Sequence, residues 1–246
     1  MDFERGLAEL GLPNYIHAAP VIDHNLPRDW CFSTVDTRRS LHTAGVSEAD
    51  PLTDEALSLT AVLFVGGESR RMGSDKALLP CSTGEPLWSR QLHLLGTLQP
   101  RFTWVSARTL PAWCPTGVEV VLDVPPSHGP LSGICACLAR LETTHLVALA
   151  IDMPRMTTEH LRTLGAMAQA SHCLIPFNGH SFEPLCAIYS KSGESVAADL
   201  LGSSDKSLQT FAKTLVEQKL ATPYYLSAVE KALYFNVNRR EDFLRI

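Results

Sequence analysis

Apolar residues gather in short runs from Thr60 onward, and polar segments separate these runs. The runs are TAVLFV at 60–65, FTWVS at 102–106, VEVVL at 118–122, HLVALAI at 145–151, HCLIP at 172–176 and PLCAIYS at 184–190. Each has the length of one strand, and several are apolar at nearly every position, which is typical of strands buried on both faces. The pattern predicts a sheet that is covered on each side.

Segments with helical features lie between these runs. Helices are expected to begin at Glu85 and Pro86, near Pro130 and at about Thr157, because proline is favoured in the first turn and threonine at the N-cap. In the segment 207–218 the apolar residues mark one helical face: Leu208, Phe211, Ala212, Leu215 and Val216. Alternating strands and helices predict an α/β fold, a three-layer sandwich around a mostly parallel, Rossmann-like sheet.

The character of the chain changes near residue 59. Residues 1–58 combine a short amphipathic pattern (Phe3, Leu7 and Leu10) with a stretch that contains proline and histidine and with a long polar run. We predict that 1–58 form a partly ordered or disordered N-terminal extension of unknown function, and that 59–246 form the main domain. A start site placed too far upstream is the alternative for 1–58, although this segment has more apolar residues than typical disorder.

Composition and charge limit the classes of partner. Of the 246 residues 45% are hydrophobic, and the net charge of −5 gives no general attraction to nucleic acid or to anionic lipid. No apolar run reaches the roughly 18 residues of a membrane span, and the N-terminus lacks the apolar core of a signal peptide. Seven cysteines without a CxxC pair favour buried thiols over zinc or disulfides. We predict a cytoplasmic protein that binds neither nucleic acid nor membranes.

The loop after the first apolar run is the main candidate for chemistry, because ligands of such sheets bind beyond the carboxyl ends of the strands. The loop reads GGESRRMGSDKALL at 66–79. Gly66 and Gly67 allow main-chain N–H groups to turn toward an anion, while Arg71 and Lys76 add positive charge. The spacing matches neither G-x-x-x-x-G-K-[ST] nor G-x-G-x-x-G. The loop is therefore a candidate phosphate site with a pattern of its own.

That pattern, G-G-x-S-x-R-M-G-x-D-K-x-x-L, resembles the signature of the molybdenum cofactor guanylyltransferases, nucleotidyltransferases with a Rossmann-like fold of the nucleotide-diphospho-sugar-transferase type. Further motifs of that family follow in order: Asp123, GPLSG at 129–133, DMP at 152–154, PLCAIY at 184–189 and NVN at 236–238. The resemblance covers residues 60–246. It implies an enzyme that transfers GMP from GTP to the terminal phosphate of Mo-molybdopterin, forming molybdopterin guanine dinucleotide and releasing pyrophosphate.

The resemblance also implies a catalytic set of Arg71, Lys76 and Asp152. Arg71 would clamp the leaving pyrophosphate and Lys76 would act as a compact cation at the phosphates. Asp152 would hold Mg²⁺, the implied cofactor, because this ion is usually bound by one or two carboxylates plus phosphates and water. The alternatives are a solvated lysine at a helix start for Lys76 and an N-cap before Pro154 for Asp152.

The resemblance implies a nucleotide-binding set of Phe64, Val65, Gly66, Gly67, Lys76, Ser106, Asp123 and Asp152. The Phe64–Val65–Gly66 segment matches the family's Leu-Ala-Gly, whose backbone can bind the base. Guanylyltransferases of the family often place an asparagine where this chain has Ser106, so the choice of guanine over cytosine stays open. Asp123 lies by the nucleotide in the family, but in this chain it can also simply start a turn.

Other residues have two interpretations. Gly129 and Gly133 suit a close approach of ribose or phosphate, and equally tight packing of a helix on the sheet. Asn178 and Glu183 match the part of the family that positions the pterin acceptor. Asn238, in the closing NVN, can instead be a helix N-cap.

Three alternatives to a guanylyltransferase stay open. Two are enzymes: a molybdenum cofactor cytidylyltransferase, and a nucleotidyltransferase for another phosphorylated acceptor. The third is a GTP-binding docking or regulatory module, in which residues 1–58 contact a molybdoenzyme or a cofactor-delivery chaperone. Tight GTP binding without turnover would favour the third.

Overall fold

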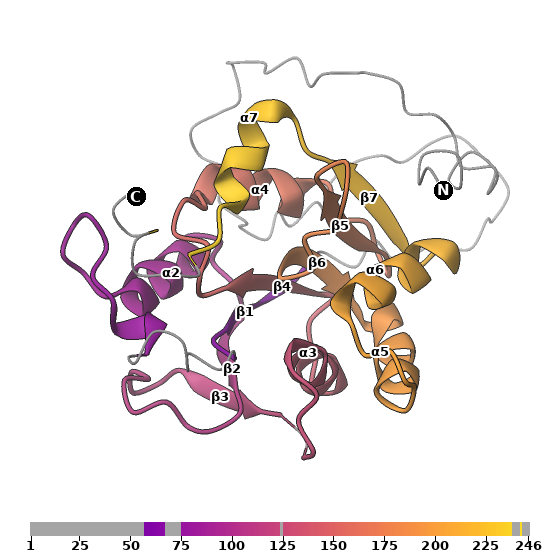
Figure 1. The fold of residues 1–246 in the computed structure, drawn as a ribbon, viewed down its shortest axis with the longest axis horizontal. Coiled ribbons are helices and arrows are strands. Elements are labelled where there is room, and N and C mark those ends of the chain that lie inside the picture. Colours follow the sequence, from indigo (N-terminus) through magenta and orange to yellow (C-terminus); the bar gives the residue numbers. More distant parts are fainter. Residues whose placement is uncertain (1–56, 67–74, 124, 238–241, 243–246) are drawn as a thin grey trace, which may run out of the picture. The chain divides into compact units, whose positions relative to one another are not determined.

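The structure, a computed structural model, describes residues 57–66, 75–123, 125–237 and 242. These residues form a seven-stranded sheet with helices on both of its faces (Figure 1). The predicted α/β sandwich is therefore confirmed. Residues 1–56 of the predicted extension lie outside the described part of the chain, so the division at residue 59 stays a prediction.

The strands agree with the apolar runs of the sequence. They are β1 (Leu59–Phe64), β2 (Phe102–Ala107), β3 (Glu119–Leu122), β4 (His145–Ala150), β5 (Cys173–Phe177), β6 (Cys186–Ser190) and β7 (Ala221–Tyr225), in the order β3-β2-β1-β4-β6-β5-β7. Strands β1 to β4 are parallel, and Phe64 at the end of β1 pairs with Ser106 on β2 and Ala150 on β4. The carboxyl ends of β1, β2 and β4 therefore meet at one edge of the sheet.

Strand β6 departs from the parallel pattern, because it is antiparallel to both β4 and β5. The physical reason is the connection from β5 to β6 at 178–185, which is too short for the crossover of a dozen or more residues that parallel neighbours need. Strand β7, which the sequence analysis did not identify, pairs in parallel with β5 and is the outermost strand on that side of the sheet. It contains Pro223, and edge strands tolerate proline.

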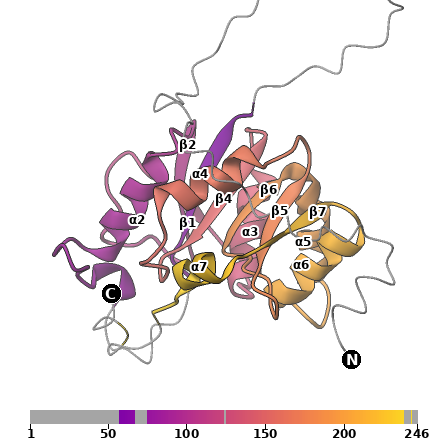
Figure 2. The ribbon, with the colours of Figure 1, turned by 90° about the horizontal axis from the view of Figure 1, so that it is seen from above.

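The helices cover both faces of the sheet. One face carries α2 (Leu87–Gly96) and α4 (Thr158–Ala166), and the other carries α3 (Pro130–Ala139), α5 (Glu194–Leu201) and α6 (Leu208–Glu217) (Figure 1; Figure 2). Pro86 and Thr157 occupy the N-caps of α2 and α4, which confirms the predicted starts. The sequence analysis missed α5.

The core is built around β1, whose six residues are all buried. Leu63 lies in an apolar cluster with Leu95 of α2 and Leu161 of α4. Thr60 is a polar residue in this strand, and its hydroxyl lies 2.8 Å from that of Thr143, so that the buried group has a partner. Within the described residues, no helix is long and apolar enough to cross a membrane.

Candidate functional site

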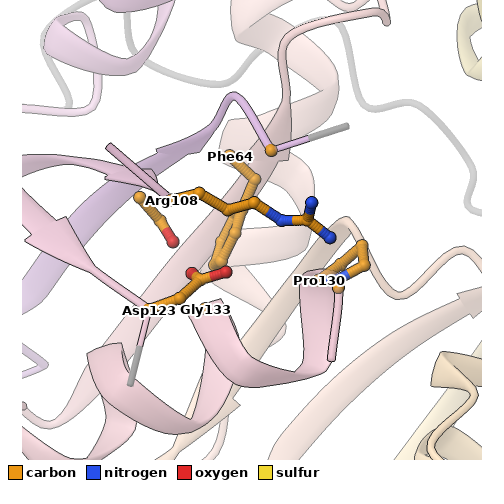
Figure 3. Close-up of a pocket in the computed structure, with 8 residues that line it drawn as sticks. Phe64, Arg108, Asp123, Pro130 and Gly133 are labelled. Carbon is orange, nitrogen blue, oxygen red and sulfur yellow. The ribbon is translucent and has the colours of Figure 1, made fainter. Parts of the chain in front are cut away.

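A cavity of about 300 Å³ lies at the carboxyl ends of β1, β2 and β3, against the start of α3 (Figure 3). Its lining residues are Phe64, Gly66, Ser106, Arg108, Asp123, Gly129, Pro130 and Gly133. Four of the residues expected to bind nucleotide, Phe64, Gly66, Ser106 and Asp123, thus come together from three separate strands. We call this space the strand-end cavity.

Gly133 allows helix α3 to approach the ends of the strands closely. A Cβ atom added at Gly133 would lie 2.5 Å from Ser106 Oγ and 3.3 Å from both the Phe64 ring and Asp123 Oδ1. Contacts of 2.5 Å do not occur between real Cβ atoms and neighbouring atoms, so a side chain at this position would move the helix or the lining of the cavity. Tight helix packing and the shape of the cavity therefore depend on the same glycine.

Hydrogen bonds with neighbouring strands already use part of the Phe64–Val65 backbone. The Val65 N–H donates to Ser106 O at 3.0 Å, and Phe64 O accepts from the Ile151 N–H at 3.0 Å. These bonds hold the three strand ends together at the floor of the cavity. A main-chain contact with a base would therefore come from the Val65 carbonyl or from Gly66.

Asp123 follows β3 and faces the strand-end cavity. Its N–H donates to Ala107 O at 3.1 Å, and its Oδ2 accepts from the Ser127 hydroxyl at 2.5 Å. The hydrogen bond to Ser127 agrees with the turn-starting role considered for this residue. Because the carboxylate also lines the cavity, the turn holds it in a position where it can accept hydrogen bonds from a ligand.

Lys76 begins the short 3₁₀ helix η2 (Lys76–Leu78) and reaches the end of β4. Its Nζ lies 3.5 Å from Asp152 Oδ2 and donates to Val237 O at 2.9 Å. The Val237 N–H in turn donates to Asp152 O at 2.9 Å. The structure thus brings Lys76 and Asp152 together, and it joins both to the NVN motif near the end of the chain.

Two residues that the sequence analysis did not identify hold the start of η2. Asp75 is the N-cap of η2 and accepts from the Ala77 N–H at 3.0 Å. Its second oxygen accepts from Trp113 Nε1 at 2.8 Å, and the Trp113 ring stacks on Trp88 at 5.5 Å between centroids. This arrangement fixes the residue next to Lys76 and thereby restricts where the ammonium group can lie.

The surroundings of Asp152 agree with those of a cation ligand. Burial raises the pKa of its carboxyl above the ordinary value of 3.8, while the nearby Lys76 charge acts in the opposite direction. A carboxylate in such surroundings gains from a cation. In the part of the chain that the structure describes, no group of three or more His, Cys, Asp or Glu side chains gathers as a metal site. Among the described residues, Asp152 is thus a single carboxylate that could hold a divalent metal ion, with the other ligands supplied from elsewhere.

A second cavity of about 370 Å³ lies at the same edge of the sheet, beside β5 and β6, and we call it the hairpin cavity. Asn178, His180, Glu183, Lys231 and Tyr234 line it. Asn178 Nδ2 donates to Glu183 Oε1 at 2.8 Å, and burial raises the pKa of the Glu183 carboxyl above its usual 4.5. Two of the residues expected near the acceptor, Asn178 and Glu183, therefore line one polar cavity.

The C-terminal segment that closes the hairpin cavity is anchored in the core. The Tyr234 hydroxyl hydrogen-bonds to His160 Nε2 at 2.8 Å, and both side chains are buried. Glu230, in helix α7 (Ala228–Lys231), lies 3.6 Å from His160 Nδ1 and accepts from the Tyr224 hydroxyl at 2.5 Å. These contacts position the segment that supplies Val237 to Lys76.

Several expected residues lie outside the described part of the chain: Gly67, Arg71 and Asn238. Their expected roles stay predictions. Conversely, Arg108 lines the strand-end cavity although the sequence analysis assigned it no role. The alternation of side chains along a strand could have indicated it, because Arg108 follows Ser106 by two residues and so faces the same side.

Comparison with known proteins identifies the family of this chain. Residues 61–220 match the family model of the MobA-like NTP transferase domain. A probable molybdenum cofactor guanylyltransferase from Opitutus terrae is 31% identical over 194 residues, which cover 78% of this chain and 96% of that protein. The match thus extends over nearly the whole length of that relative.

Solved structures share the fold. That of molybdopterin-guanine dinucleotide biosynthesis protein A from Archaeoglobus fulgidus is 25% identical, with a TM-score of 0.55 over 76% of this chain and 95% of that chain. A 2-C-methyl-D-erythritol 4-phosphate cytidylyltransferase from Thermus thermophilus is 14% identical, with a TM-score of 0.51 over 75% of this chain and 95% of that chain. Chains named for guanine and for cytosine nucleotides thus have this fold, so the fold alone does not decide the base.

Two findings establish the family of the chain: the length of the matches and the order of the motifs. The matched region contains Phe64, Lys76, Ser106, Asp123 and Asp152, which the structure brings to one edge of the sheet. The chain belongs to the MobA-like NTP transferase family and is a nucleotidyltransferase related to the molybdenum cofactor guanylyltransferases.

Proposed function

We propose that this protein transfers GMP from GTP to the terminal phosphate of Mo-molybdopterin, forming molybdopterin guanine dinucleotide and pyrophosphate. One observation carries the proposal: two cavities lie at the same edge of the sheet, on either side of the Lys76–Asp152 pair. In the strand order, β4 with Asp152 at its end stands between the two cavities. Such a site can hold two substrates whose phosphates meet at a shared centre of charge.

In the reaction, an oxygen of the acceptor phosphate forms a bond to the α-phosphorus of GTP, and the bond from that phosphorus to the bridging oxygen of pyrophosphate breaks. The protein supplies positioning and charge neutralisation for this transfer. Lys76, held by Val237 O, would stabilise negative charge on the phosphates. Arg71 is proposed from the sequence motif to contact the leaving pyrophosphate.

Asp152 is the proposed ligand of Mg²⁺. When bound, the ion would neutralise phosphate charge and hold the triphosphate in position. The raised pKa of the Asp152 carboxyl supports this role, because a carboxylate that is poorly solvated binds a cation more readily than an exposed one.

The hairpin cavity is proposed for the pterin end of the acceptor. A pterin ring presents amino and ring N–H donors on one edge, and the Glu183 carboxylate, held by Asn178, can accept from both. Lys231 adds a positive charge at the same cavity. The strand-end cavity is left for the nucleoside of GTP, and its lining of Phe64, Ser106 and Asp123 suits a base with polar edges.

The test is a panel of the four ribonucleoside triphosphates with Mg²⁺, in which pyrophosphate release is measured with and without molybdopterin. We expect release with GTP that depends on molybdopterin. Release with CTP in preference to GTP would identify a cytidylyltransferase instead. Release only with another phosphorylated acceptor would refute molybdopterin as the acceptor. Tight GTP binding without any turnover would favour a docking or regulatory module. A cytoplasmic location and a protein partner for residues 1–58 stay predictions from the sequence.

A further inference from the structure

Arg108 provides a positive charge at the rim of the strand-end cavity, where the sequence motifs assign no residue. It follows the last residue of β2 and lies two positions beyond the buried Ser106, so both face the cavity from the same strand. Ser106 is only 2% exposed, whereas Arg108 is exposed. Figure 3 shows the guanidinium extending from the end of β2 across the cavity toward Pro130.

A negative charge lies beside Arg108 in the same cavity, because Ala107 of β2 pairs with Leu122 of β3. Asp123 follows β3, and its Oδ2 is held by the Ser127 hydroxyl at 2.5 Å. Figure 3 shows the Asp123 carboxylate below the extended Arg108 side chain. A flat ligand that enters this space would therefore meet a donor fork along one edge and a carboxylate along another.

Guanine is the base whose edges match these two groups. Its O6 and N7 are adjacent acceptors, which a guanidinium can bind through two parallel hydrogen bonds. Its N1–H and N2–H₂ groups are donors that suit a carboxylate. Adenine places an amino group where guanine has O6, so it would lose the paired contact. Cytosine has an adjacent pair of acceptors in O2 and N3, but this pair lies on a different edge of the base relative to the ribose, so a guanidinium placed for O6 and N7 would not bind it in the same way.

The buried Ser106 alone does not provide selectivity between bases. A single hydroxyl can donate one hydrogen bond and accept others, so it does not distinguish guanine from cytosine by itself. The Phe64 ring can stack on either base. The Arg108 guanidinium at the rim, with its paired donors, adds the selectivity between bases that the floor of the cavity lacks.

We propose that Arg108 selects guanine by a bidentate hydrogen bond to O6 and N7 of the base, beside Asp123. This inference rests on the proposed function, because it assigns the base subsite of the same nucleotide site. It goes further in naming a specificity residue and the atoms that the residue contacts.

The experiment measures equilibrium binding of nucleotides in the presence of Mg²⁺ and without an acceptor, by competition with a fluorescent GTP analogue. The variants are Arg108→Ala and Arg108→Lys, and the probes are GTP, CTP and 7-deaza-GTP, in which a C–H group replaces N7. Arg101→Ala is the matched control, since Arg101 lies at the opposite end of β2 and rests on the Phe102 ring at 5.1 Å. Thermal unfolding of each variant checks that the fold is kept.

For the wild type we expect tighter binding of GTP than of CTP, and about 10-fold weaker binding of 7-deaza-GTP than of GTP. Arg108→Ala should weaken GTP binding by about 10- to 100-fold, leave CTP binding unchanged and abolish the difference between GTP and 7-deaza-GTP. Arg108→Lys should also lose that difference, because lysine keeps the charge but lacks the fork. Arg101→Ala should behave as the wild type.

Equal weakening of all three nucleotides in Arg108→Ala would overturn the proposal, because it would mean that the guanidinium contacts phosphate. An unchanged preference for GTP in that variant would also overturn it. Failure of the proposed function gives a different result: selective GTP binding by the wild type without any pyrophosphate release would refute the transfer reaction while leaving the role of Arg108 intact.

Discussion

The two cavities differ in how the chain builds them. The strand-end cavity is formed by parallel strands and the start of α3, and its walls include three glycines and a proline. The hairpin cavity is formed beside the antiparallel strand β6 and the C-terminal segment, and its lining is polar: Asn178, His180, Glu183, Lys231 and Tyr234. The first depends on close approach of backbone, and the second on side chains that hold one another in place. Substitutions should therefore affect the two cavities separately, except at the Lys76–Asp152 pair between them.

The largest effect is expected at that shared pair. Lys76→Ala and Asp152→Ala should each lower the rate of pyrophosphate release by at least about 100- to 1,000-fold, because each removes a charge that acts on the reacting phosphates. Steady-state kinetics with GTP, Mg²⁺ and molybdopterin provide the measurement, and unchanged thermal unfolding would show that the fold is intact. Asp199→Ala, on the exposed side of α5, is the control. Rates near that of the wild type in either variant would remove the pair from the mechanism.

An intermediate effect is expected in the strand-end cavity. Gly133→Ala should weaken GTP binding by about 10-fold or more and lower stability by about 1–3 kcal/mol, because the new Cβ would lie 2.5 Å from Ser106 Oγ. Adding Ser106→Ala should restore most of the stability, since it removes the clashing atom. Binding is measured by competition and stability by denaturant unfolding.

Gly165→Ala is the matched control for this change. Gly165 lies inside α4 and has nothing within 4 Å of an added Cβ, so alanine there should leave stability unchanged or raise it by about 0.4–1 kcal/mol. If Gly133→Ala proved as harmless as Gly165→Ala, the cavity would not depend on close approach of the helix.

The smallest effect is expected in the hairpin cavity. Glu183→Gln should raise the KM for molybdopterin by about 10-fold, as expected for one lost charge-assisted hydrogen bond, and leave GTP binding unchanged. Because burial raises the pKa of the Glu183 carboxyl above 4.5, protonation should weaken acceptor binding at a higher pH than for an exposed glutamate. Affinity should therefore be full above this raised pKa and fall as the pH drops through it, and the glutamine variant should lack this dependence.

Glu217→Gln, on the exposed side of α6, is the control for the hairpin cavity. Titration of molybdopterin at several pH values gives the measurement for both variants. An effect of Glu183→Gln on GTP binding as large as that on the acceptor would contradict the separation of the two cavities.

The order of apolar runs predicted much of the fold, because a strand buried on both faces must be apolar at nearly every position. Strands β1 to β6 were identified this way. Helix α6 was identified by its apolar face, and helices α2, α3 and α4 by the proline and threonine residues near their starts. Elements with weaker signals were not: β7 is an edge strand with a proline, and α5 is short. The reversal of β6 follows from the short connection between the apolar runs at 172–176 and 184–190, which has no room for a crossover helix.

The candidate site likewise has one part that the sequence determines and another that only the tertiary structure determines. The sequence by itself determined which residue types lie at the end of each strand or after it, and the resemblance of its motifs to a known family indicated Lys76, Ser106, Asp123 and Asp152 as candidate site residues. Tertiary structure alone decided which groups meet: it sets the 3.5 Å between Lys76 and Asp152 and the anchoring of Lys76 by Val237. The physical reason is that a strand end is a local property of the chain, whereas the meeting of strand ends depends on the order, direction and register in which the whole sheet pairs.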